Sequence, residues 1–110
     1  MARAARPESG PSAPEVAEAF AALASCVEAR STEAEVSQQI RLVRSVCERA
    51  AVHAPGTEAG RLLSNVQQAL ETWRTVWPRL GAQQEFRAAV VREARLWAKR
   101  FQEAAPWNHQ

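Results

Sequence analysis

Length, composition and charge limit this chain to a few classes of protein. It has 110 residues, 46% of them hydrophobic and 24% charged, as expected for one globular domain with a single core and unlike a disordered chain. No apolar run approaches the eighteen or so residues that a membrane span needs, so we expect no membrane insertion. A formal charge of +2 is far from the dense positive charge typical of nucleic-acid-binding domains.

The two halves of the chain differ in charge. Residues 1–60 hold six Arg and eight Glu, a charge of −2, whereas residues 61–110 hold seven Arg, one Lys and four Glu, a charge of +4. The basic bias of the second half is modest, and it indicates an acidic partner or nucleic acid only weakly.

The first twelve residues, "MARAARPESGPS", are rich in Pro, Gly, Ser and Arg and predict a short flexible arm over 1–12. A mitochondrial leader is the alternative, which Glu8 and the two prolines weaken. The chain has two cysteines and no secretory signal peptide, so we expect reduced thiols and an intracellular protein of the cytoplasm or nucleus.

Two capping boxes predict where the first two helices begin. Ser12 with Glu15 and Thr32 with Glu35 have the spacing at which a hydroxyl and a carboxylate each accept a backbone N–H. Apolar stripes at helical spacing then extend each helix, to give helices over about 13–29 and 33–53.

The third and fourth helices follow from the same periodicity. Thr57 is the expected N-cap of a helix over 58–77, and the "WPRLG" stretch after it predicts a tight corner, with Pro78 ending the helix and Gly81 supplying a left-handed turn. The fourth helix is expected over 82–104, followed by a tail over 106–110.

Four helices with short connections over residues 13–105 predict an all-α fold, an antiparallel up-down four-helix bundle. Two stacked helical hairpins of a solenoid are the alternative, but the chain shows no repeated motif at a fixed period.

The tryptophans raise the question of core against binding site. Trp73 with Trp77, and Trp97 with Phe101, are pairs four residues apart on the apolar stripes, which favours packing in the core. The alternative is one indole at a groove edge with an arginine stacked on it. Trp107 lies beyond Pro106 in the polar tail and is expected to dock either on the bundle or on a partner.

Apolar residues away from the stripes are the candidates for a protein interface. Leu42 and Val46 form one such pair on the second helix, and Val91 and Leu96 flank the polar side of the fourth. Boundary packing within a monomer is the other interpretation of these residues. Together with Trp107 they predict contact with a partner subunit or a homodimer.

Arg92, Arg95 and Lys99 lie opposite the main stripe of the fourth helix; we call them the basic ridge. A solvated face is the simplest interpretation. Use of the ridge by nucleic acid, together with Arg74 and Arg79 of the third helix, is the alternative, and an acidic protein is a further candidate partner.

The sequence offers no catalytic residue, cofactor site or metal site that we can single out. There is no Asp, both histidines (His53 and His109) fall outside the predicted helix interiors, and no glycine-rich phosphate loop is present. We interpret Cys26 and Cys47 as small buried apolar residues. We therefore expect a non-enzymatic interaction module, a subunit or adaptor of a larger complex, with nucleic-acid association or an apolar ligand between the helices as alternatives.

Overall fold

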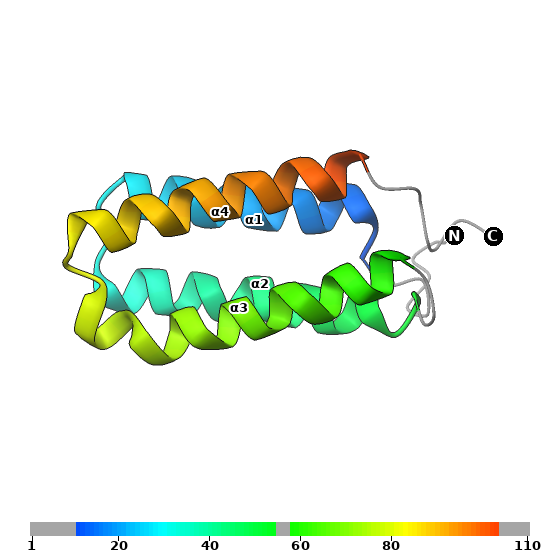
Figure 1. Ribbon diagram of the computed structural model, residues 1–110, viewed down its shortest axis with the longest axis horizontal. Coiled ribbons are helices and arrows are strands. Elements are labelled where there is room, and N and C mark those ends of the chain that lie inside the picture. Colours follow the sequence, from blue (N-terminus) through cyan, green and yellow to red (C-terminus); the bar gives the residue numbers. More distant parts are fainter. Residues whose placement is uncertain (1–10, 55–57, 104–110) are drawn as a thin grey trace, which may run out of the picture.

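The structure is a computed structural model that describes residues 11–54 and 58–103, and these residues form four α-helices and no strand. The helices are α1 (Ala13–Glu28), α2 (Glu33–Ala51), α3 (Glu58–Leu80) and α4 (Gln84–Glu103). They pack together as an all-helical bundle, so the predicted fold class is confirmed at this level (Figure 1).

Both predicted capping boxes are present. The Ser12 hydroxyl accepts the backbone N–H of Glu15, whose carboxylate accepts the backbone N–H of Ser12 in return. Thr32 and Glu35 make the same pair of bonds at the start of α2. These contacts satisfy backbone donors that a helix N-terminus otherwise leaves without partners, and they fix where α1 and α2 begin.

The end of α1 depends on an arginine in a left-handed conformation. Arg30 has φ 59°, and the N–H groups of Arg30 and Ser31 bond the carbonyls of Val27 and Cys26. This pattern is a Schellman ending, in which glycine usually occupies the left-handed position. The chain thus reverses into α2 without glycine.

The helix ends differ from the predicted ones by one to three residues. Pro11 is buried and Ser12 caps α1, so the folded unit begins before the predicted end of the arm at residue 12. α1 ends at Glu28 and α2 at Ala51, with Val52 and His53 in a turn, and α4 begins at Gln84. The predicted cap Thr57 and the tail over 106–110 lie outside the described residues.

The prediction that Pro78 ends the third helix is wrong, because α3 continues through Pro78 to Leu80. A proline in the last turn forfeits only one backbone hydrogen bond, and the Trp77 carbonyl still accepts the Gly81 N–H at 2.8 Å across it. Gly81 is needed for space and not for a left-handed turn. A Cβ there would lie 2.7 Å from Nε1 and from the carbonyl oxygen of Trp77.

The four helices do not share their contacts equally. α1 packs most extensively on α4 and also contacts α2, α2 packs on α3, and α3 and α4 share the fewest contacts of any neighbouring pair. In Figure 1, α1 and α4 lie side by side, as do α2 and α3, and α3 and α4 are the two helices nearest the viewer.

Most residues of the predicted stripes form the core, whereas some stripe residues of α3 and α4 are only partly buried, and no polar or charged residue of the described chain is fully buried. Phe20 and Phe101 stack at its centre, with ring centroids 6.0 Å apart and an interplanar angle of 5°. None of the described helices is both long enough and apolar enough to cross a membrane.

Candidate interaction surfaces

Three large apolar side chains of the described residues are exposed: Leu42 (51%), Leu96 (47%) and Val52 (71%). Val52 follows α2 in a turn, whereas Leu42 and Leu96 lie in the middle of helices. The other two predicted interface residues that the structure describes, Val46 and Val91, are partly buried against the core. Trp107 lies outside the described residues.

Leu42 and Val46 lie on the edge of α2 that is turned toward α1. Arg44 on the same helix reaches α3, where it bonds Glu71, and helical geometry puts Leu42 and Val46 about 160° to 200° around the helix from Arg44. The partly buried Ala19 and Cys26 occupy the corresponding edge of α1, opposite the edge from which Glu28 reaches α4. We call these four residues the α1–α2 face.

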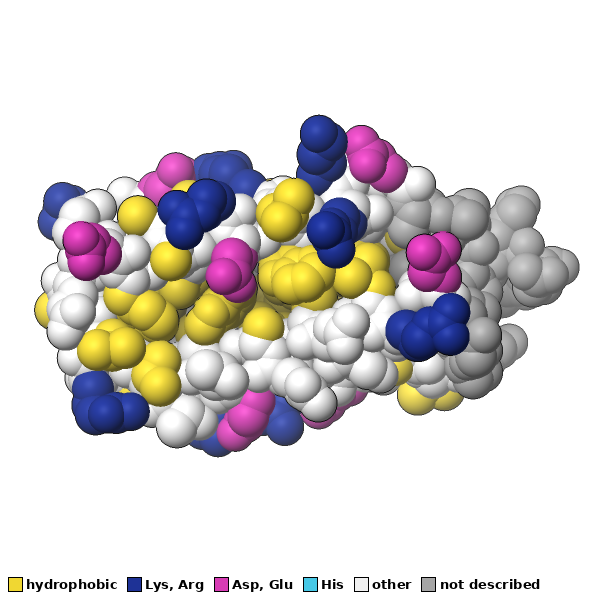
Figure 2. All heavy atoms as spheres, in the orientation of Figure 1, with side chains coloured by type: hydrophobic (Ala, Val, Ile, Leu, Met, Phe, Trp, Pro, Cys, Tyr) yellow, Lys and Arg dark blue, Asp and Glu magenta, His cyan; other side chains and the backbone are white. Residues whose placement is uncertain are grey.

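Another set of partly covered apolar residues follows the line where α3 and α4 meet. On α3 they lie on the edge away from Glu71, which bonds α2. On α4, Phe86 and Trp97 lie about 160° to 180° around the helix from Arg95, which bonds α1. The exposed Leu96 lies further out, about 100° around the helix from Arg95. Figure 2 shows a band of hydrophobic side chains along the bundle on the side of α3 and α4. We define the α3–α4 face as Leu62, Ala69, Val76, Phe86, Leu96 and Trp97.

The structure therefore separates Val91 from Leu96, which the sequence paired. Val91 lines a pocket with Val27 and Arg30 of the α1 end, whereas Leu96 lies on the α3 side, about 140° around α4. Leu42 and Leu96 belong to opposite sides of the bundle, since α1 and α2 lie behind α4 and α3 in Figure 1. The candidate residues thus make two surfaces and not one.

Of the tryptophans, Trp73 (6%) and Trp77 (2%) are buried as predicted for the core, but Trp97 is partly exposed. The Trp97 indole Nε1 is enclosed without a hydrogen-bond partner, and the Arg100 guanidinium lies 5.5 Å from its ring centroid. The arrangement of an arginine over a partly exposed indole, considered from the sequence, therefore occurs at Trp97.

The basic ridge is exposed along α4, but its central arginine is engaged. Arg95 donates a hydrogen bond to the Glu28 carboxylate on α1 and forms an ion pair with it. Arg92 and Lys99 form no ion pair with any described residue. Two cations with no paired carboxylate make few contacts with phosphates, so the ridge by itself offers little nucleic-acid affinity.

Arg87 bonds backbone carbonyls at two corners of the bundle, a role that the sequence did not predict. Its guanidinium donates to the carbonyl of Gly81 at 2.7 Å and to that of Val27 at 2.9 Å, and it lies 5.5 Å from the Trp77 ring centroid. The arginine thus satisfies carbonyls at the end of α1 and at the α3–α4 corner. Its position directly after a stripe residue, Phe86, was the only signal in the sequence.

Two open pockets adjoin Arg87, of about 270 Å³ beside Val27 and Val91 and about 210 Å³ beside Trp77 and Gly81. Both lie at the bundle end that holds the α1–α2 and α3–α4 corners. Glu28 and Arg30 also line the first pocket, and Glu33 lines the second.

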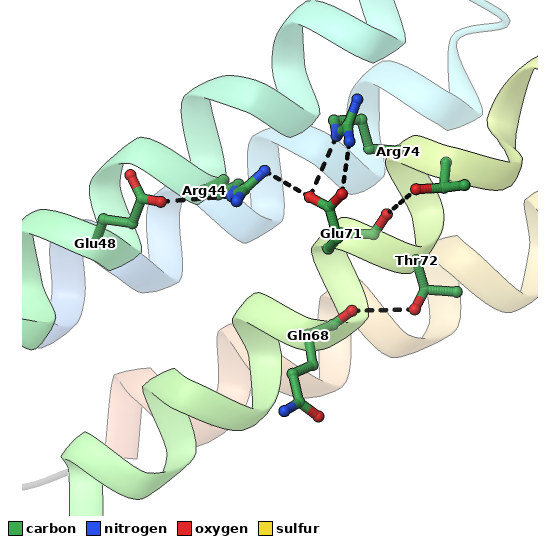
Figure 3. Close-up of polar contacts among 7 residues, drawn as sticks. Arg44, Glu48, Gln68, Glu71, Thr72 and Arg74 are labelled. Carbon is green, nitrogen blue, oxygen red and sulfur yellow. Dashed lines mark hydrogen bonds and ion pairs between the residues drawn. The ribbon is translucent and has the colours of Figure 1, made fainter.

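A polar network joins α2 to α3 on the far side of α3 from the apolar band (Figure 3). Arg44 bonds Glu71 at 2.5 Å and pairs with Glu48 at 3.4 Å, and Arg74 donates two hydrogen bonds to the same Glu71 carboxylate. The bonds from Arg74 hold the pKa of Glu71 below its usual range. All four side chains are well exposed, which makes this network a modest contributor to stability.

The cysteines differ in environment. Cys47 is fully buried, and this burial, with a smaller effect of the Glu48 carboxylate, raises the pKa of its thiol to about 12. Such a thiol is inert as a nucleophile at neutral pH. Cys26 is partly exposed and free. Within residues 11–54 and 58–103, no three His, Cys or Glu side chains are placed to hold a metal ion.

Comparisons with known proteins found no matching family model, no matching curated protein and no matching solved structure. The function proposed below is therefore based on the surfaces alone.

Proposed function

We propose that this protein is a non-catalytic helical interaction module, a small subunit or adaptor of a larger intracellular complex. The supporting observation is that Leu42 and Leu96 are about half exposed in mid-helix positions, whereas the other large apolar side chains of the four helices are buried or partly buried. Exposed apolar side chains next to partly covered apolar residues are typical of protein-binding surfaces.

The proposal includes an antiparallel up-down arrangement of the four helices, which the short connections after Glu28 and Leu80 favour. In such an arrangement each side of the bundle presents two neighbouring helices along their full length. A partner then contacts helix surfaces and not loops, which gives a rigid site with little entropy to lose on binding.

The test is capture of stoichiometric partners by the tagged protein from an extract of the cells that make it, with nuclease treatment and a high-salt wash. Two variants, Leu42→Glu and Leu96→Glu, put a charge into each surface in turn. Val52→Glu is the matched control, because it makes the same kind of change at a more exposed apolar residue outside both surfaces. We expect the bound protein to be lost with Leu42→Glu or Leu96→Glu and retained with Val52→Glu.

Equal capture by all three variants would refute the assignment of these surfaces. Loss of every partner on nuclease treatment alone would instead support nucleic-acid association through Arg92, Arg95 and Lys99, and that binding should weaken steeply with salt.

A further inference from the structure

We propose that the α3–α4 face binds the α1–α2 face of a second copy of this chain. The inference rests on the proposed interaction function and names its partner. It starts from the placement of the two half-exposed leucines, Leu42 and Leu96, on opposite sides of one bundle.

Charge complementarity selects this pairing. Helices α1 and α2 together carry six Glu and three Arg, a formal charge of −3. Helices α3 and α4 carry five Glu, seven Arg and one Lys, a formal charge of +3. A contact between one helix pair and the other brings opposite net charges together, whereas a two-fold contact of either pair with itself would bring like net charges together.

The shapes of the two apolar surfaces also differ in a complementary way. On the α1–α2 face, Leu42 is half exposed, whereas Ala19 and Cys26 of that face are small and partly buried, so Leu42 is its most prominent side chain. On the α3–α4 face, the two helices make few contacts, and Val76, Phe86 and Trp97 are partly covered along their junction. A projecting leucine received between residues of two facing helices is the common packing mode of helical assemblies.

In this pairing one copy contributes its α3–α4 face and the other its α1–α2 face, so a dimer still has one unused face on each copy. Such a contact does not close after two copies unless its rotation generates a ring. The protein should therefore form oligomers that grow with concentration, and they should shorten as salt screens the charge attraction.

Sedimentation velocity on the purified full chain at several concentrations tests this, with Leu42→Glu, Leu96→Glu and the control Val52→Glu. Each interface variant alone should sediment as a monomer. An equimolar mixture of the two should form a heterodimer, because Leu42→Glu keeps an intact α3–α4 face and Leu96→Glu keeps an intact α1–α2 face. Val52→Glu should assemble like the unmodified chain.

Two outcomes would overturn the inference. If the unmodified chain stays monomeric over a 100-fold range of concentration, a second copy is excluded as the partner. If one interface variant alone forms a dimer, and mixing the two variants gives no heterodimer, the contact is between like faces. Circular dichroism checks that each variant folds, and Leu42→Gln and Leu96→Gln replace any that does not. If the chain does not self-associate, the capture experiment can still support the proposed function, by finding a different protein that binds the unmodified chain and is lost with Leu42→Glu or Leu96→Glu. The two proposals can therefore fail separately.

Discussion

The α1–α4 and α3–α4 junctions differ in the size of the side chains that meet there. Ala17 and Ala24 line the α4-facing edge of α1, the edge that ends with Glu28, and α4 contributes Ala94 and Ala98. Small side chains let these helices approach closely over their length, in agreement with their extensive contact.

The α3–α4 junction instead contains Trp73, Phe86 and Trp97, and these helices make little contact beyond the corner where the rings of Trp77 and Phe86 lie 5.4 Å apart. Large side chains at a helix contact hold the axes apart. One core is thus closed by small side chains along the α1–α4 junction and is only partly covered along the α3–α4 junction. The following predictions test that difference.

The largest effect is expected at the closed side. Phe20→Ala removes a fully buried ring stacked on Phe101 and should lower the free energy of unfolding by about 3–5 kcal/mol. Phe86→Ala, at the open junction, removes a ring that is already partly exposed and should cost about 1–2 kcal/mol. Urea unfolding followed by circular dichroism measures both, and equal losses would contradict the distinction between the junctions.

Arg87 is expected to support the open junction at its corner. Arg87→Met keeps the aliphatic part of the side chain but removes the bonds to the carbonyls of Gly81 and Val27, and it should cost about 1.5–3 kcal/mol. Arg87→Lys keeps the charge but cannot reproduce both bonds with one planar group, so we expect it to recover only part of the loss. A full recovery in urea unfolding would show that charge alone matters at this corner.

Adding volume should lower stability much more at the closed junction than at the open one. Ala24→Leu places three extra carbons in the closed α1–α4 junction, where Ala24 is fully buried, and should cost about 1–3 kcal/mol. Ala69→Leu adds the same carbons beside the open α3–α4 junction and should change stability by less than about 0.5 kcal/mol. Thermal unfolding of the two variants gives the comparison, and a larger loss for Ala69→Leu would reverse it.

The sequence predicted what depends on local chemistry and on periodicity. Ser12 and Thr32 specify their helix starts through contacts three residues away, and the stripes through Phe20 and Trp73 identify the buried side of each helix. Pro78 was misjudged because the preference of the residue before a proline is weaker than the closing bond between Gly81 and Trp77.

The candidate surfaces were less predictable because they depend on which helices are neighbours. Leu42 and Leu96 were identified from their positions away from the stripes, but nothing in the sequence placed them on opposite sides of the bundle. The partial exposure of Trp97 follows from the distance between α3 and α4. The link from Arg87 to Val27 spans 60 residues, which periodicity within a helix cannot reveal.

The smallest expected change in stability concerns the titration of the buried Cys47 thiol. Burial raises the pKa of this thiol from an ordinary value of 9.0 to about 12 in the folded chain, so the unfolded chain loses the proton first. Stability is unaffected below pH 9 and should fall as pH rises from 9 toward 12, by about 1.4 kcal/mol per pH unit.

Urea unfolding between pH 8 and 10 should therefore show a loss of about 1.4 kcal/mol in the unmodified chain that is absent in Cys47→Val. A thiol reagent at pH 8 should modify the partly exposed Cys26 and spare Cys47. If Cys47 reacts as fast as Cys26 in the native protein, the bundle opens readily in solution. That opening should occur at the α3–α4 junction, because α3 and α4 make the fewest contacts of any neighbouring helices.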